Sequence, residues 1–252
     1  MFLLRPVVPG VGPSCETADL VLKVELHAHT SDDPLDRIPY STYDLIDRAA
    51  ELGYDALAVT LHDRQLDLAP VAGHAATRGI VLIPGIERTI EGRHVLLLNF
   101  SRAAERVDSF DDLAALKRQE QGLVVAPHPY FPSGASLFGR LNRHAGLFDA
   151  VEYNAMYTRT LNFNLPAVRW AARHGKPLVG NGDVHCFAQF GTTYSLVEAG
   201  RNPASICRAI AAGRVRVVTT PLSWATAGRV MASIVRGSMG SGSRLPQPEL
   251  QT

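Results

Sequence analysis

The sequence predicts a single α/β domain built around a parallel sheet, and three observations support that prediction. The 252 residues are 46% hydrophobic and 19% charged, which is typical of a globular protein with a substantial core. Short runs rich in Val, Ile and Leu alternate along the chain with amphipathic segments. Neither a linker nor a repeat of fixed period divides the sequence, so we expect one domain.

Seven apolar runs are expected to form the strands, because each is short and rich in Val, Ile and Leu. They span residues 21–27, 55–61, 80–86, 93–99, 122–127, 149–153 and 177–181. Four helices are expected between or after them, over residues 41–53, 109–121, 161–174 and 203–213. The helix at 41–53 is the clearest, since Ser41 or Thr42 can cap its beginning and Gly53 suits its end.

The two ends of the chain differ in composition from the domain that we place at residues 21–235. Residues 1–20 contain several prolines and glycines and are expected to form an irregular lead-in. Residues 236–252 are rich in Gly, Ser, Pro and Gln, so we expect a disordered tail there.

Charge and cysteine content exclude several classes of function. The formal net charge of +1 gives no global attraction to anionic membranes or to long nucleic acid, although one basic groove would reverse the second point. The three cysteines are widely spaced and form no disulfide framework, which fits a reducing cytoplasm. No apolar run approaches the roughly 18 residues of a membrane span. We therefore expect a cytoplasmic protein, whose oligomeric state stays open.

Six of the nine histidines lie in short blocks beside apolar runs, and three carboxylates are interleaved with them. Apolar strands that repeatedly finish on imidazole or carboxylate are hard to explain by packing. They are what a chain needs to place metal ligands around one mouth of a barrel. These residues are His27, His29, Asp36, His62, Glu87, His94, His128, Asp183 and His185.

Two dipeptide motifs at opposite ends of the chain give the strongest evidence. His27 and His29 lie two apart at the end of a strand, so both imidazoles can face one side. Asp183 and His185 repeat this spacing after the last predicted strand. Either motif alone could be a polar, half-exposed strand end. In a closed barrel the first and last strands are neighbours, so the two motifs would meet.

The other candidates have alternatives of their own. Glu87 alone could be a solvated carboxylate at the start of a loop. His94 begins an apolar run, which also fits a core or strand-edge histidine. His128 lies between two prolines, a stiff frame that suits either a ligand or a plain turn. The remaining histidines, His74, His144 and His174, are expected at the surface.

Six imidazoles and at least two carboxylates exceed what one tetrahedral zinc can use. They suit two or three divalent metal ions, with Glu87 as a natural bridging ligand. Mixed nitrogen and oxygen ligands without thiolate favour Zn, Mn or Fe over Ca or Mg. The sequence contains no Gly-x-Gly-x-x-Gly, Walker-type or Gly-x-Ser-x-Gly motif, which argues against nucleotide-fold and serine-hydrolase readings.

These blocks, in this order, resemble the PHP (polymerase and histidinol phosphatase) family over roughly residues 21–220. The matching pieces are ELHAHT at 25–30, ALAVTLHD at 56–63, PGIE at 84–87, HVL at 94–96, PHP at 127–129 and GDVH at 182–185. The resemblance implies a distorted seven-stranded (β/α)7 barrel with a trinuclear metal centre for phosphoester hydrolysis.

The resemblance also implies a ligand set. It places His27, His29, His62, Glu87, His94, His128, Asp183 and His185 on ligand positions. A ninth ligand is expected in the following loop, where we choose Asp36 over Asp32 and Asp33 because it keeps nearly the usual distance to Ser41. One block departs from the pattern: Leu61 stands where an Asp usually precedes the histidine, which removes a hydrogen bond to a ligand and not a ligand itself.

The expected reaction is hydrolysis of a small phosphomonoester or nucleotide by a metal-bridging hydroxide, with Asp183, His185 and Glu87 as catalytic residues. The substrate-binding candidates follow strand ends: Arg64, Arg88, Asn154 and Arg159. Two alternatives remain. One is an amidohydrolase-type enzyme acting on C–N or C–O bonds, which often needs a bridging lysine that none of the three lysines can supply. The other is a non-catalytic metal-binding regulatory module.

Overall fold

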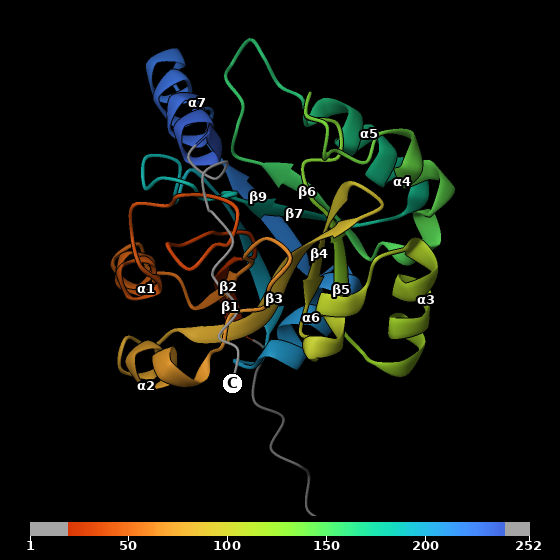
Figure 1. Ribbon diagram of the computed structural model, residues 1–252, viewed down its shortest axis with the longest axis horizontal. Coiled ribbons are helices and arrows are strands. Elements are labelled where there is room, and N and C mark those ends of the chain that lie inside the picture. The colour runs from red at the N-terminus through yellow and green to blue at the C-terminus, as the bar shows by residue number, and fades with distance from the viewer. Residues whose placement is uncertain (1–19, 240–252) are drawn as a thin grey trace, which may run out of the picture.

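The computed structural model describes residues 20–239, which form one nine-stranded sheet curled into a nearly closed barrel (Figure 1). The strands are β1 (Leu20–Glu25), β2 (Ala56–Val59), β3 (Val81–Ile90), β4 (Arg93–Leu98), β5 (Leu123–Ala126), β6 (Ala150–Asn154), β7 (Leu178–Asn181), β8 (Thr193–Ala199) and β9 (Val215–Thr219). The lead-in prediction for residues 1–19 and the tail prediction for residues 240–252 lie outside the described residues.

The helices surround this sheet. The α-helices are α1 (Thr42–Glu51), α2 (Ala69–Thr77), α3 (Phe110–Gln119), α4 (Gly139–Arg143), α5 (Leu165–His174), α6 (Pro203–Ala211) and α7 (Trp224–Met239), with short 3-10 turns η1 (Arg102–Arg106) and η2 (Ala145–Leu147). Helix α1 begins with a capping box in which Ser41 and Asp44 bond each other's backbone nitrogens. Because α7 continues to Met239, residues 236–239 are helical and not part of a tail.

The predicted count of seven strands is wrong, because β8 and β9 escape a search for apolar runs. Strand β8 alternates buried residues with Tyr194, Leu196 and the exposed Glu198, so only one of its faces is buried, and that face includes the polar Ser195. Strand β9 is only partly buried and contains Arg216. Each of the seven predicted runs does overlap one of the strands β1 to β7.

The sheet is mixed and not parallel. Its order is β7-β6-β5-β4-β3-β2-β1-β8-β9. Strands β3 and β4 form a hairpin whose two turn residues, Glu91 and Gly92, have φ of 47° and 76°, the left-handed conformation that such tight turns use. Strand β4 is therefore antiparallel to both neighbours. Its first residues lie at the end of the barrel where β3 and β5 finish.

Strand β7, at one edge of the sheet, closes the barrel against β8 through a side chain. The backbone nitrogen of Gly180 donates to Ser195 Oγ at 2.9 Å, and that hydroxyl donates to the carbonyl of Gly180 at 3.1 Å. A methyl group at Gly180 would lie 2.7 Å from the carbonyl oxygen of Tyr194. Only glycine allows this approach without displacement.

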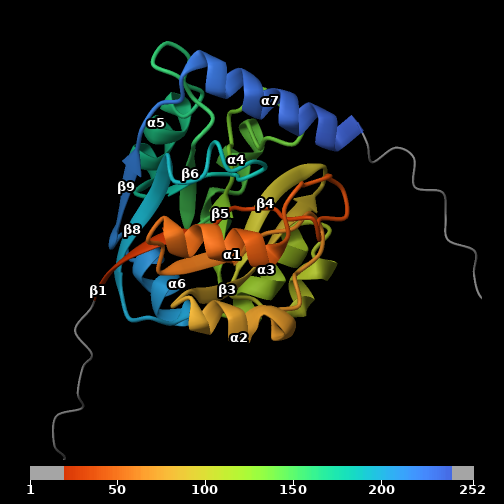
Figure 2. The same cartoon turned by 90° about the vertical axis from the view of Figure 1, so that its left-hand side faces the viewer.

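One end of the barrel is filled and the other holds the polar residues. Residues of α6, including Ile206 and Ile210, pack with the inward side chains of eight of the strands in one apolar cluster. Helices α1 and α2 cover one side of the sheet and α3 to α5 another, while α7 lies across the end opposite α6 (Figures 1 and 2). No helix within residues 20–239 is both long and apolar enough to cross a membrane.

Candidate metal centre

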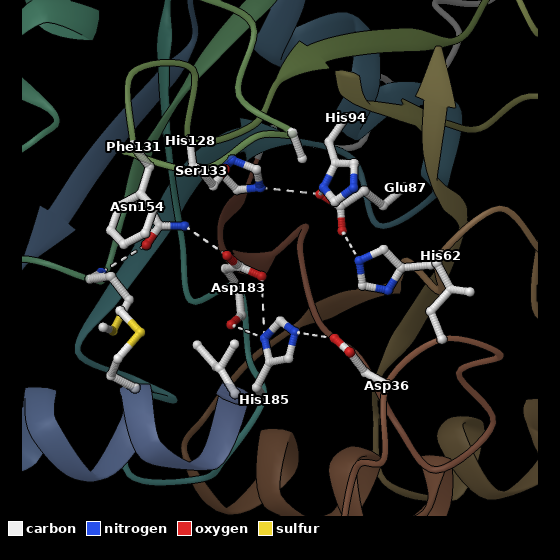
Figure 3. Close-up of a pocket in the computed structure, with 15 residues that line it drawn as sticks. Asp36, His62, Glu87, His94, His128, Phe131, Ser133, Asn154, Asp183 and His185 are labelled. Carbon is white, nitrogen blue, oxygen red and sulfur yellow. Dashed lines mark hydrogen bonds and ion pairs between the residues drawn. The ribbon is translucent and has the colours of Figure 1, made fainter. Parts of the chain in front are cut away.

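The candidate ligands gather at the end of the barrel opposite α6, most of them around one pocket (Figure 3). The parallel strands deliver most of them just beyond their last residues. His27 and His29 follow β1, His62 follows β2, Glu87 lies in β3, His94 in β4, Asp36 in the loop before α1, His128 follows β5, and Asp183 and His185 follow β7. Reversal of β4 explains why His94 begins an apolar run and still reaches this end.

The two dipeptide motifs meet through the backbone. Ala28 and Val184 form an isolated parallel bridge. In it the nitrogen of His29 donates to the carbonyl of Val184 and the nitrogen of Val184 donates to the carbonyl of His27, both at 3.1 Å. Strand β1 pairs with β2 and β8 and not with β7, yet the residues beyond β1 and β7 are neighbours as the barrel argument predicted.

Glu87 is the centre of the cluster. Its carboxylate is buried, and each oxygen faces a different group of imidazoles (Figure 3). Oε1 lies 2.7 Å from His94 Nδ1 and 3.2 Å from His128 Nε2, while Oε2 lies 3.1, 3.3 and 3.3 Å from the Nε2 atoms of His27, His29 and His62. This arrangement allows one carboxylate to bridge two ions.

Asp183 forms the second acidic point. Its Oδ1 lies 3.3 Å from His27 Nε2, 3.5 Å from His29 Nε2 and 3.4 Å from His185 Nδ1. Its Oδ2 accepts a hydrogen bond from Asn154 Nδ2 at 3.2 Å. On the other side of the imidazole, His185 Nε2 lies 3.1 Å from Asp36 Oδ2.

Two buried carboxylates orient the histidines from behind, and the sequence reasoning did not assign them this role. His27 Nδ1 donates to Glu152 Oε1 at 2.8 Å, and His29 Nδ1 donates to Asp33 Oδ2 at 2.9 Å. A carboxylate on one ring nitrogen fixes the tautomer and leaves the other nitrogen free for a metal ion. Glu152 was detectable, because it lies two residues before Asn154 on β6 and therefore faces the same side.

Buried ring nitrogens without partners test whether metal ions fit here. Among the described residues, His27 Nε2 and His29 Nε2 are buried and make no hydrogen bond, although carboxylate oxygens lie close by. Three groups of side chains could each hold an ion, their ligand atoms lying within 4.8 Å of one another. They are His27, Glu87 and His128; His27, His29 and Asp183; and His29, His62 and Glu87. His27, His29 and Glu87 each belong to two of these groups, so any ions held there would lie close together.

The electrostatics agree with this arrangement. Burial disfavours charge on His27 and His29, but the facing carboxylates outweigh it and hold the pKa of both rings well above the usual value. Burial acts likewise on Glu87 and Asp183, but the imidazoles around them hold the pKa of both carboxyls well below the usual value. Without metal, protons on the imidazoles balance the carboxylates.

Two of the candidate ligands have strained backbones. His128 has φ of 27° and Asp183 has φ of 50°, which is uncommon for residues with side chains. The nitrogen of His128 donates to Glu152 Oε2 at 2.7 Å, and Gln189 Nε2 donates to the carbonyl of Asp183 at 2.7 Å. Such strain persists only where surrounding contacts impose it, and it is common at functional sites.

Burial also raises the pKa of one carboxyl beside the centre, Glu25, to about 8. Glu25 accepts hydrogen bonds from the nitrogens of Gly182 and His27. It therefore joins the loop after β7 to the end of β1, a role that sequence reasoning missed.

The predicted substrate-binding residues divide into two groups. Asn154 lines the pocket beside Asp183 (Figure 3). Arg64 is exposed and donates to the carbonyl of Asp32, and Arg159 is exposed as well. Arg88 donates to Asp63 at 2.6 Å and also to Asp108, which lies between η1 and α3. None of the three arginines is among the described residues that line the pocket.

Comparison with known proteins places this centre in context. The family model described as PHP-associated matches residues 162–215, and no curated protein matches the sequence significantly. Among solved structures, the chain is similar to a two-domain protein from Bacteroides vulgatus that contains a predicted PHP-like metal-dependent phosphoesterase. The two share 19% sequence identity over 82% of this chain and 70% of that one, with a TM-score of 0.61.

Two further similarities span different activities. The lesion-specific endonuclease PfuEndoQ from Pyrococcus furiosus shares 14% identity over 92% of this chain and 74% of that one, with a TM-score of 0.55. An amidohydrolase from Chromobacterium violaceum with bound sulfate shares 19% identity over 64% of this chain and 87% of that one, with a TM-score of 0.52. At these identities the likeness shows the fold alone.

Proposed function

Because the chain is a PHP-domain family protein, we propose that it is a metal-dependent phosphoesterase acting on a small phosphomonoester or nucleotide. The supporting observation is that His27 and His29 aim buried, unpartnered Nε2 atoms at Glu87 and Asp183. A buried polar atom without a partner costs about 1–3 kcal/mol. Divalent ions shared between these four side chains would remove that cost.

The proposed ligand set is the nine residues predicted from the sequence, holding two or three ions of Zn, Mn or Fe. The loop ligand in this proposal is Asp36, because it lines the pocket and faces His185. The two other acidic residues of the loop have different partners: Asp33 bonds the histidines from behind, and Asp32 accepts from Thr42 Oγ1 at 2.8 Å.

When bound, such ions supply Lewis acidity and lower the pKa of water enough for a nucleophile to exist near neutral pH. In the hydrolysis, the oxygen of water forms a new bond to phosphorus, the ester P–O bond breaks, and the released alcohol takes up a proton from the water. Glu152 and Asp33 hold the imidazoles in place during this reaction. Asp183 and His185 both line the pocket, so we expect this pair to carry the proton from the attacking water to the released alcohol.

The amidohydrolase alternative has less support. A bridging lysine would need to reach the centre, but Lys23 donates to the carbonyl of Leu52 and Lys117 donates to Asp149. Neither these nor Lys176 is among the described residues lining the pocket. In the proposed centre, Glu87 would take the bridging place.

The test is phosphate release from a panel of phosphomonoesters and nucleotides by metal-stripped protein resupplied with Mn or Zn. We expect release that depends on metal and is lost in Asp183→Asn and in the double variant His27→Ala/His29→Ala, with circular dichroism unchanged. His174→Gln, on the outer helix α5, serves as the matched control and should keep full activity. Activity that survives both metal removal and Asp183→Asn would overturn the proposal. Metal-dependent cleavage of amides or of damaged duplex DNA alone would replace it.

A further inference from the structure

The pocket at the metal centre is lined by two kinds of side chain. It encloses about 520 Å³, within the range of small-molecule sites. The polar kind consists of seven of the nine proposed metal ligands, all but His27 and His29, together with Asn154 and Ser133. The apolar kind comes from four separate segments, and we call it the apolar wall: Leu35, Phe131, Ala135, Met156, Met231 and Ile234.

Helix α7 supplies the part of the apolar wall that covers the site. It lies across the end of the barrel that holds the metal centre (Figure 2). Met231 and Ile234 are three residues apart, so they lie on the same face of the helix, and both line the pocket. Val230 is fully buried beneath the helix, whereas Val235 is 48% exposed and does not line the pocket.

Polar groups available to a substrate are few on this side. Asn154 donates to Glu152 and Asp183 and accepts from the nitrogen of Met156 at 2.7 Å, so both ends of its amide are used. Ser133 Oγ lies 3.1 Å from Ser136 Oγ, so the Ser133 hydroxyl makes one hydrogen bond there and could make another to a substrate. Among the described lining residues there is no arginine or lysine.

We propose that the substrate is a phosphomonoester of an apolar alcohol or phenol, whose leaving group packs against Met231 and Ile234. This inference rests on the proposed phosphoesterase function. The phosphate would meet the metal centre, since no arginine or lysine lines the pocket among the residues that the structure describes. A sugar or a nucleobase would set hydroxyl groups, amino groups or ring nitrogens against the apolar wall without partners, which disfavours binding.

A matched pair of substrates tests the inference: propyl phosphate and glycerol 3-phosphate, which share a three-carbon chain and differ by two hydroxyl groups. We expect a higher kcat/KM for propyl phosphate, and a rise of roughly fourfold for each methylene added from ethyl to butyl phosphate. AMP and other nucleotides should be poor substrates.

Variants of α7 connect this preference to the wall. Met231→Gln keeps the size of the side chain and should lower kcat/KM for butyl phosphate at least about fourfold, while changing the value for glycerol 3-phosphate little. Val235→Gln makes the same kind of change on the outer face and should leave both values unchanged. Calorimetric binding of phenylphosphonate and inorganic phosphate to the metal-loaded protein gives a second readout, in which Met231→Gln should weaken phenylphosphonate alone.

The outcomes separate the two proposals. Equal or better turnover of glycerol 3-phosphate or AMP would overturn the apolar-substrate inference while the phosphoesterase function stands. Hydrolysis of none of the esters would overturn the function itself. Equal affinity for phenylphosphonate and phosphate, unaffected by Met231→Gln, would overturn the binding role of the wall whatever the reaction.

Discussion

Asp33 Oδ2 accepts two hydrogen bonds from His62, one from the backbone nitrogen and one from Nδ1, both at 3.0 Å. The same oxygen accepts from His29 Nδ1 at 2.9 Å. Leu61, the departure from the family pattern just before His62, is fully buried in the apolar core and can orient nothing. A residue nearly thirty positions earlier in the chain therefore aligns two adjacent imidazoles.

Asp33→Asn should weaken metal binding by about 10- to 100-fold. A carboxylate bonded to the Nδ1 atoms of His29 and His62 sets the orientation and basicity of both imidazole rings. The amide keeps the size of the side chain but places an N–H₂ group where the carboxylate accepts hydrogen bonds. Competition with a chromogenic chelator measures the change. Asp32→Asn is the matched control, since Asp32 bonds Thr42 and no histidine. Equal affinities for the two variants would contradict the role given to Asp33.

The stability of the metal-free protein should fall as pH rises above neutrality. Facing carboxylates hold the pKa of His27 and His29 above the ordinary 6.5. The protonated rings thus contribute stability that is fully present below pH 6.5 and is lost as pH rises through the folded-state pKa. Metal ions replace those protons, so the loaded protein should not share the loss.

Two measurements check this. The difference in Tm between loaded and metal-free protein should widen from pH of about 6 to about 9. Calorimetry near neutral pH in buffers of different ionisation enthalpy should show proton release when metal binds. Metal binding without proton release would mean that the rings are neutral before the ions arrive.

Most of the candidate ligands were predicted because they follow the ends of apolar strands. The same reasoning failed for the predicted substrate-binding arginines, and the reasons are geometric. Arg88 follows Glu87 in β3, and successive side chains on a strand point to opposite faces. Since Glu87 faces the centre, Arg88 faces away, which sequence alternation alone could have shown. Arg64 lies two residues after His62, but Asp63 between them has φ of 53°, so the chain has already turned.

The strands that sequence reading found most readily are those that are buried on both faces. Strands β2 and β5 are continuous apolar runs that sequence reading finds at once. Strand β8 is buried on one face only, and the buried Ser195 on that face accepts a hydrogen bond from the nitrogen of Gly180 in β7. That contact depends on how the barrel closes, which is a long-range property that no local pattern contains.

Arg88→Met should reduce stability and not substrate affinity. Its guanidinium donates to Asp63, to Asp108 and to the carbonyl of Val107, and its side chain is only 13% exposed. Removing these bonds should lower the free energy of unfolding by about 1–3 kcal/mol, measured by urea denaturation. KM for the phosphorylated substrate should stay unchanged, as it should in the exposed control Arg159→Met. A rise in KM at unaltered stability would return Arg88 to the substrate site.

Gly180→Ala should destabilise the barrel and weaken metal binding together. The added methyl would lie 2.7 Å from the carbonyl oxygen of Tyr194 and 2.9 Å from Val217 Cγ1, and a backbone atom cannot swing aside as a side chain can. Overpacking of this kind costs about 1–3 kcal/mol. Because β7 leads directly into Asp183 and His185, any shift of the strand also moves two candidate ligands.

The matched control for that substitution is Gly73→Ala in the middle of α2, where a methyl group would meet no atom within 4 Å. Alanine there should stabilise the protein by about 0.5–1 kcal/mol, because glycine loses more backbone entropy in a helix. Thermal denaturation and chelator competition on both variants give the comparison. If Gly180→Ala matched the native protein in both assays, β7 could not be packed against β8 as closely as Ser195 and Tyr194 indicate, and the barrel would have to close in another way.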